Sequence, residues 1–221
     1  MFMTIGLAVI VNNFDKYPWI GLVLYRGAVK CISVLFPTYA IAPASCLRNP
    51  SKAYSIKTEH YHVRVTHYAV HKKYSDANFA NDLAILRFRG PIQLASSRSF
   101  YRMSGLIRSM KFPVFSVGWM KVNGTLNLVQ NPVKAIGNPE CQIAYPDTSS
   151  SQACARFLPS ITRDCLNSCG APIFQNVSGN ILLAGITSWG PVCGKKSIPL
   201  IYTKSRQLSR SYYHSAGSEI Q

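Results

Sequence analysis

The chain has 221 residues, of which 48% are hydrophobic and 14% charged, and 24 Lys+Arg against 8 Asp+Glu give a formal net charge of +16. This composition excludes a disordered polycation, and no stretch approaches the roughly 20 apolar residues of a membrane span. A chain of this length forms one or two compact domains with a sizeable core.

The first 11 residues are apolar but lack the basic start and the small-residue cleavage site of a signal peptide. Segment 1–11 is therefore either the remnant of a signal peptide or the result of a mis-assigned start codon. Residues 12–221 then form the folded domain.

Short runs rich in β-forming residues recur along that domain, with turn signals between them. They lie at 20–25, 28–36, 62–70, 83–88, 113–119, 125–135, 171–174, 181–188 and 200–203. In the 62–70 run, alternation predicts that Val63, Val65, His67 and Ala69 share one face. Helical periodicity is confined to 141–145 and 204–214. This pattern predicts an all-β sandwich or barrel, with a Ser/Arg-rich linker at 95–108 between two halves.

Seven cysteines are present, and none of them forms a Cys-x-x-Cys pair. The spacing of Cys165 and Cys169 is looser, and without a second close pair of Cys or His we expect no structural zinc. Two glycosylation sequons begin at Asn123 and Asn176 and favour the secretory pathway. We therefore expect a secreted, extracellular glycoprotein with disulfide bonds.

Several motifs occur in one order along the chain. They are Gly-Ala-Val-Lys-Cys-Ile-Ser at 27–33, Ala-Ile-Ala-Pro-Ala-Ser-Cys at 40–46, Asn-Asp-Leu-Ala-Ile-Leu at 81–86, Val-Gly-Trp at 117–119, Asp-Cys-Leu-Asn-Ser-Cys-Gly-Ala-Pro-Ile at 164–173, Ser-Trp-Gly at 188–190 and Ile-Tyr-Thr at 201–203. Together they resemble the trypsin-like serine proteases over about residues 17–210.

The resemblance implies a chymotrypsin/trypsin fold: two antiparallel β-barrels, at about 12–98 and 99–221, and a short C-terminal helix. It also implies three disulfides, each closing a loop that contributes about 3 kcal/mol to stability. The implied pairs are Cys31–Cys46, Cys141–Cys154 and Cys165–Cys193. Cys169 is then left unpaired.

The catalytic positions that the resemblance assigns are altered. Ser45 occupies the place of the histidine that takes the nucleophile's proton, so the general base is missing. Asp82 keeps the carboxylate, which we expect to be buried and hydrogen-bonded by the backbone or by Ser45. Cys169 replaces the serine nucleophile, and a thiol without an activating partner is only a few per cent thiolate at pH 7.

The surrounding machinery departs from the family pattern as well. Ser168 stands where an aspartate accepts the new N-terminal ammonium after zymogen cleavage, and the matching Ile-Val-Gly-Gly motif is absent. The resemblance places the oxyanion hole at the backbone of Asn167 and Cys169. It places the specificity pocket at Arg163, Gly190 and Leu200, so that any side chain entering should be small or acidic. The alternative is that Arg163 is a surface residue beside a collapsed pocket.

No histidine lies at a position in the sequence that would let it replace the missing general base. His60 and His62 share a strand face, a spacing compatible with a metal, but no third ligand lies nearby. We therefore expect no metal and no cofactor.

The sequence is compatible with three functions. The first is a secreted, non-catalytic serine protease homologue that binds a protein, such as an active protease or an acidic protein, in a protease cascade, immunity or reproduction. The second is a weak residual hydrolase that uses Cys169. The third is a binder of heparin-like sulfated glycans, because the charge includes pairs at 72–73 and 195–196 and no nucleic-acid motif accompanies it.

Overall fold

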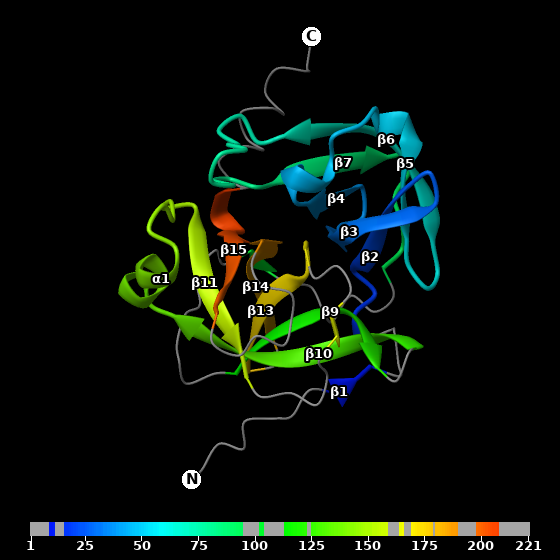
Figure 1. The fold of residues 1–221 in the computed structure, drawn as a ribbon. Helices are drawn as coiled ribbons and strands as arrows, with labels where there is room; N and C mark the ends of the chain where they lie inside the picture. Colours follow the sequence, from blue (N-terminus) through cyan, green and yellow to red (C-terminus); the bar gives the residue numbers. More distant parts are fainter. Residues whose placement is uncertain are drawn as a thin grey trace.

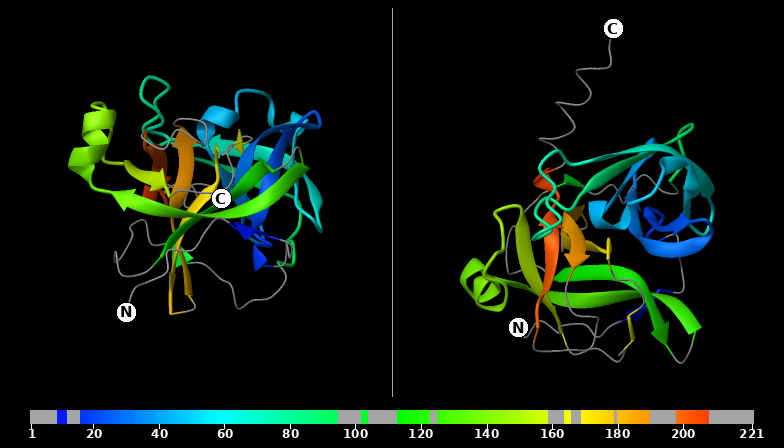
Figure 2. Two further views of the ribbon diagram at one scale, coloured as in Figure 1. Left: turned by 60° about the horizontal axis from the view of Figure 1, so that its bottom comes forward. Right: turned by 45° about the horizontal axis from the view of Figure 1, so that its top comes forward.

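The computed structural model describes residues 9–11, 16–94, 102–103, 113–122, 125–158, 164–165, 169–178, 180–189 and 198–207. These residues form mostly antiparallel strands and a short α-helix. The strands build two barrels that lie side by side (Figure 1, Figure 2). The all-β, two-barrel prediction is therefore confirmed.

The first barrel is drawn in blue to green in Figure 1 and closes in the order β2-β3-β4-β7-β6-β5. Its strands are β2 (Ile20–Tyr25), β3 (Ala28–Leu35), β4 (Tyr39–Ala42), β5 (Tyr54–Lys57), β6 (His62–Val70) and β7 (Ala84–Phe88). A two-residue turn with positive φ at both Arg26 and Gly27 joins β2 to β3, the conformation that suits the twist of a hairpin. Two 3₁₀ turns, η2 (Ala44–Cys46) and η3 (Ser51–Ala53), connect β4 to β5.

The second barrel closes because β9 pairs with both β10 and β13. Its strands are β9 (Val114–Val122), β10 (Thr125–Ile136), β11 (Gln152–Phe157), β13 (Pro172–Val177), β14 (Asn180–Trp189) and β15 (Leu200–Lys204). Helix α1 (Asn138–Ala144) connects β10 to β11, and a proline in its first turn suits a helix start. Three two-residue strands pair with this barrel: β1 (Val9–Ile10) with β10, β8 (Arg102–Met103) with β14, and β12 (Asp164–Cys165) with β9.

A shared apolar cluster joins the two barrels. It contains Trp19 and Ile32 from the first barrel's chain segment and Val117 and Phe174 from the second. The rings of Trp19 and Phe174 meet edge to face, with centroids 5.7 Å apart, a favoured aromatic geometry. Burial of these side chains fixes how the barrels sit against each other, and so fixes the residues at their junction.

The structure refines the predicted elements. Most predicted runs are strands within a few residues of the predicted bounds, but β4, β5 and β11 were missed. Strands β4 and β5 have only four residues each, and the β11 sequence contains no β-branched residue. The β-propensity of these segments therefore gave little indication of a strand. The predicted alternation along β6 is wrong past Val65, because a register shift between Val65 and His67 interrupts it.

Two further predictions concern the linker and the C-terminus. Residues 102–103 of the predicted linker are strand β8, and the other linker residues from 95 onward lie outside the described part of the chain. The predicted C-terminal helix at 204–214 begins too early, because Lys204 is the last residue of β15. Residues 206–207 are helical, and residues 208–214 lie outside the described part of the chain.

Candidate functional site

Three residues far apart in the sequence meet at the junction of the barrels. Ser45 lies in η2, just after β4, and Asp82 lies just before β7. Cys169 immediately precedes Gly170 and β13 of the second barrel. These are the three residues that the sequence resemblance places at the catalytic positions, and the structure brings them into contact.

Asp82 is fully buried and accepts several hydrogen bonds. The backbone N–H of Ser45 donates to Oδ1 over 2.8 Å, and the Ser45 hydroxyl donates to Oδ2 over 2.9 Å. The Ser188 hydroxyl donates to the same Oδ2, and the backbone of Ala44 adds another bond. The expectation of a buried carboxylate bonded by Ser45 is thus met, while Ser188 is a partner that the sequence analysis missed.

Burial raises the pKa of the Asp82 carboxyl, although the hydrogen bonds from Ser188 and Ser45 partly oppose that effect. Taking a carboxylate out of water penalises its charged form, and donors restore part of the lost solvation. Asp82 is therefore a desolvated carboxyl whose donors are two serines and the backbone.

The Cys169 thiol lies against polar and sulfur atoms. Its Sγ donates to the carbonyl oxygen of Ser188 over 2.9 Å, lies 3.8 Å from Sγ of Cys46, and contacts the Ser45 side chain. The hydrogen bond with Cys46, together with burial, raises the pKa of Cys169 well above its ordinary value. This environment keeps the sulfur as a thiol and does not favour a thiolate.

The backbone around Cys169 is tied to both barrels. Its carbonyl accepts a hydrogen bond from the Ile32 N–H of β3 over 2.9 Å, and the Gly170 N–H donates to Thr187 of β14 over 2.7 Å. Gly170 has φ of +88°, and a Cβ there would overlap the carbonyl oxygen of Ile32. Only glycine fits this close approach, which explains why the Cys-Gly pair can sit directly on the first barrel.

The cysteines differ in part from the expected pairing. Cys141 and Cys154 form the expected disulfide, between α1 and β11. Cys31 and Cys46, expected as a pair, are instead free thiols. The Cys46 thiol hydrogen-bonds with Cys31 and lies 3.8 Å, sulfur to sulfur, from Cys169.

Several predicted site residues lie outside the described part of the chain: Arg163, Asn167, Gly190, Cys193 and Asn123. The side chain of Cys165 is outside it too, so its pairing with Cys193 and the oxyanion hole stay predictions. Leu200 is buried in the second barrel's core, opposite Ala155 on β11. Asn176 is exposed near the end of β13.

A pocket of about 290 Å³ lies beside this centre and was not predicted. Its lining comes from the loop before Asp82, the end of α1 and the chain after it, and the strands β11, β14 and β15: Ala77, Asn78, Phe79, Ala144, Tyr145, Pro146, Asp147, Thr148, Gln152, Trp189 and Ile201. Trp189 follows Ser188 directly. The Ser-Trp-Gly motif was the one sequence signal that could have located the pocket.

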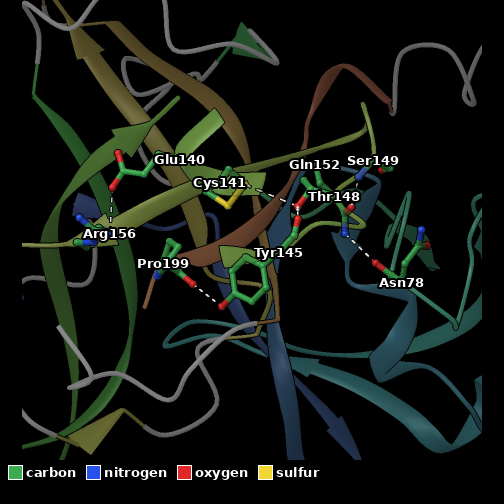
Figure 3. Close-up of a disulfide and its surroundings, with 10 residues drawn as sticks. Asn78, Glu140, Cys141, Tyr145, Thr148, Ser149, Gln152, Arg156 and Pro199 are labelled. Atoms are coloured by element: carbon green, nitrogen blue, oxygen red, sulfur yellow. Dashed lines mark hydrogen bonds and ion pairs between the residues drawn. A yellow bond between two sulfur atoms is a disulfide. The ribbon is translucent and has the colours of Figure 1, made fainter. Parts of the chain in front are cut away.

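Aromatic contacts and hydrogen bonds hold the pocket walls in place. The ring of Trp189 packs against those of Tyr145 and Phe79, with centroids 4.8 and 5.9 Å away. Figure 3 shows the Tyr145 hydroxyl directed at the carbonyl of Pro199, 2.7 Å away, and the Gln152 amide directed at Asn78, 3.0 Å away. The pocket is thus bounded by residues of both barrels.

The described histidines lie elsewhere. His62 on β6 contacts Ser55 through its ring, and His71 bonds the backbone of Lys73. Burial lowers the pKa of His71. Among the described residues, no group of three or more His, Cys, Asp or Glu side chains is arranged to hold a metal ion.

Comparison with known proteins gives a consistent result. The Trypsin family model matches residues 12–210. Human Transmembrane protease serine 11B is 27% identical over 216 residues, covering 85% of this chain and 50% of that protein. Coagulation factor XII from Cavia porcellus is 25% identical, covering 85% of this chain and 36% of that protein.

The fold is matched by a solved structure of neuropsin, a serine protease of mouse brain, with a TM-score of 0.76 and 21% identity. That match covers 94% of this chain and 98% of neuropsin. The chain spans about half the length or less of the two curated relatives above. Within its described residues, no helix is long and apolar enough to cross a bilayer. With a family match that spans most of its length, the chain belongs to the trypsin family.

Proposed function

We propose that this chain is a secreted, non-catalytic member of the trypsin family that acts by binding another protein. Its role would be that of a cofactor or regulator in a protease cascade of immunity or reproduction. The binding region would be the junction of the barrels, where the family places its chemistry.

One observation carries the proposal: the thiol of Cys169 contacts a serine hydroxyl where hydrolysis needs a base. A hydroxyl has one proton to donate, and that of Ser45 goes to Asp82. Ser45 therefore presents Cys169 with a neutral hydroxyl, which is far too weakly basic to take a proton near neutral pH, and the partial lowering of the Cys169 pKa by Ser45 does not offset the effects of Cys46 and burial. The raised pKa of Cys169 acts in the same direction.

The pocket beside this centre supports the binding half of the proposal. Trp189 is 39% exposed at its edge, and Ile143 on α1, next to the lining residue Ala144, is 85% exposed. Exposed large apolar side chains beside a pre-formed hollow are typical of recognition surfaces. We expect the pocket to take an apolar side chain from a partner protein.

The experiment is a turnover assay with a broad set of fluorogenic peptide esters and amides, comparing the wild type with Cys169→Ala. The proposal expects equal rates for both proteins, at the background of the buffer. Turnover by the wild type that disappears in Cys169→Ala would instead establish the alternative function, a weak hydrolase with Cys169 as nucleophile.

A second assay addresses binding. Photo-crosslinking from position 145 in the native fluid should give one adduct, which Trp189→Ala weakens at least about tenfold, the loss typical of an interface hot spot. The control is Val29→Ala, because Val29 is also 39% exposed but lies on β3. Equal adduct yields in both variants would remove the pocket from the proposal.

Binding of a sulfated glycan is the second candidate, favoured by the outer face of the first barrel. Lys57 on β5 lies directly opposite His62 on β6, and Arg64 follows on the same strand. Exposed Lys72 and Lys73 come soon after β6. If this face binds heparin, Lys57→Ala/Arg64→Ala should elute from a heparin column at lower salt, with no matching change on a simple cation exchanger.

A further inference from the structure

One buried side chain of the second barrel is bonded to the loop of the first barrel that forms a wall of the pocket. Gln152 begins β11 and is only 1% exposed. Its Nε2 donates to the carbonyl oxygens of Asn78 over 3.0 Å and Phe79 over 3.1 Å (Figure 3). Its Oε1 accepts a hydrogen bond from the Ser149 N–H over 2.9 Å. Both amide protons and the amide oxygen of Gln152 therefore have partners inside the protein.

The loop that Gln152 contacts has a backbone conformation that is rare for its residue types. The φ of Phe79 is +54°, and that of Asn81 is +52°. Asparagine enters this left-handed region several times more often than most residues, but a bulky phenylalanine there is an outlier. Such a conformation persists only where surrounding contacts hold it. The hydrogen bond from Gln152 to the Phe79 carbonyl is a contact of this kind.

Two more hydrogen bonds support the same region. The Asn81 N–H donates to the Ser151 hydroxyl oxygen over 2.9 Å, which joins the loop before β7 to the turn before β11. The Lys204 ammonium of β15 donates to the Ser150 carbonyl over 3.0 Å. The turn that presents Gln152 to the loop is thus itself fastened to the second barrel.

The conformation of Phe79 decides where its ring lies in the pocket. The ring packs on Trp189 with centroids 5.9 Å apart, and Phe79 and Gln152 both line the hollow. The direction of a Cα–Cβ bond depends on the backbone angles of its residue. If Phe79 relaxed to an ordinary negative φ, its side chain would point elsewhere and the wall facing Trp189 would be lost.

We propose that Gln152 is a positioning residue for the pocket. Its two donated hydrogen bonds, to Asn78 and Phe79, act as an amide clamp that holds Phe79 in the left-handed conformation, so that the hollow is formed before any partner arrives. A site formed in advance binds more tightly, because no loop has to be ordered on binding. The benefit to a partner rests on the proposed function, whereas the amide clamp itself does not.

The test is hydrogen exchange of loop 77–81 in the folded full chain, measured by mass spectrometry of peptic fragments. Gln152→Met keeps a side chain of similar length that can neither donate to the carbonyls nor accept from Ser149. We expect the loop amides to exchange at least about tenfold faster in this variant, because a released loop opens locally. Amides within β6 and β7 should exchange at the wild-type rate.

Ser205→Ala is the matched control for a general loss of stability. Ser205 is also 1% exposed, and its hydroxyl donates to the Leu183 carbonyl over 2.7 Å, within the second barrel and not to the loop. Its loop exchange should equal that of the wild type. Equal acceleration in Gln152→Met and Ser205→Ala would overturn the proposal. So would an Asn81 amide in the wild type that exchanges as fast as an unprotected peptide, a result that needs no variant to fold.

A glycine at position 79 tests whether the amide clamp acts on the backbone of that residue. Glycine adopts the left-handed conformation without steric cost, so Phe79→Gly has less need of the amide clamp. Gln152→Met should therefore accelerate loop exchange less in the Phe79→Gly protein than in the wild type. Equal acceleration in the two backgrounds would mean that Gln152 does not hold the Phe79 conformation.

Photo-crosslinking from position 145 in the native fluid separates this inference from the proposed function. With the amide clamp removed in Gln152→Met, the adduct yield should fall below that of Ser205→Ala. Equal yields in these two variants would overturn the role of Gln152 in the pocket. If the wild type itself gives no adduct, the proposed function fails, and the exchange rates of loop 77–81 alone decide whether the amide clamp exists.

Discussion

The centre around Asp82 and the pocket beside it are neighbours in space but differ in exposure. Asp82 has no exposed surface and is surrounded by donors, whereas Trp189, one residue after its partner Ser188, is 39% exposed above a hollow of about 290 Å³. The carboxyl of Asp82 is closed off from solvent, whereas the pocket beside it is open.

The largest expected effect comes from Gly170, which packs the closed centre. Gly170→Ala would push a Cβ into the Ile32 carbonyl in a left-handed conformation, and we expect a loss of more than about 3 kcal/mol in the free energy of unfolding. Urea denaturation measures it. Gly90→Ala is the matched control, because Gly90 also has positive φ but has open space around it, so its cost should be about 1 kcal/mol. Equal losses of unfolding free energy in Gly170→Ala and Gly90→Ala would mean that Gly170 does not lie in close contact with Ile32.

The next effect concerns the support of the open pocket. Replacing both Cys141 and Cys154 by alanine removes a disulfide that spans 13 residues and should lower the free energy of unfolding by about 3 kcal/mol. Chemical denaturation under non-reducing conditions measures the loss. Glu140→Ala is the control on the same helix. It removes a half-exposed ion pair with Arg156, 2.9 Å long, which is worth less than about 1 kcal/mol.

The buried carboxyl should give a pH dependence with a defined sign. Because the pKa of Asp82 is raised by folding, the folded state holds its proton more tightly than the unfolded state does. Its contribution is therefore fully present below the ordinary carboxyl pKa and is lost as pH rises through the higher folded value. In Asp82→Asn this decline should be missing. Parallel curves of unfolding free energy against pH for the two proteins would contradict the buried state of Asp82.

A smaller effect is expected at the pocket wall. Tyr145→Phe deletes the hydroxyl that donates to the Pro199 carbonyl over 2.7 Å and keeps the ring that packs on Trp189. The cost should be about 1 kcal/mol, measured by thermal or chemical denaturation. Tyr25→Phe on the first barrel serves as the comparison. If Tyr145→Phe instead lowers the free energy of unfolding by more than about 3 kcal/mol, the hydroxyl supports more of the fold than this single hydrogen bond.

The sequence predicted the fold well because motifs at 40–46, 81–86 and 164–173 sit at the contact points between elements. It also predicted that Ser45 and Asp82 would meet. It did not predict Ser188 as a partner of Asp82, since a serine at the end of a strand carries no sign of what lies across the barrel. The sequence did not predict the pocket for the same reason. Its aromatic residues Phe79, Tyr145 and Trp189 become neighbours only when the two barrels pack together.

The cysteines show the other limit of sequence reasoning. The resemblance to the family implied the Cys141–Cys154 pair, and the structure contains it. Spacing and resemblance could not show that Cys46 contacts two other sulfurs at once. That arrangement depends on the glycine at 170, which lets the chain after Cys169 approach β3.

The central claim, that Cys169 is not an activated nucleophile, is tested most directly by its alkylation rate in the reduced, folded protein. Iodoacetamide labelling of Cys169 is followed by mass spectrometry from pH 5 to pH 10, with Cys169→Ala identifying the labelled peptide. The account predicts a slow rate that is still rising at pH 10, as a thiol with a raised pKa requires. A rate that reaches its plateau by pH 7 would reveal a stabilised thiolate and contradict the account.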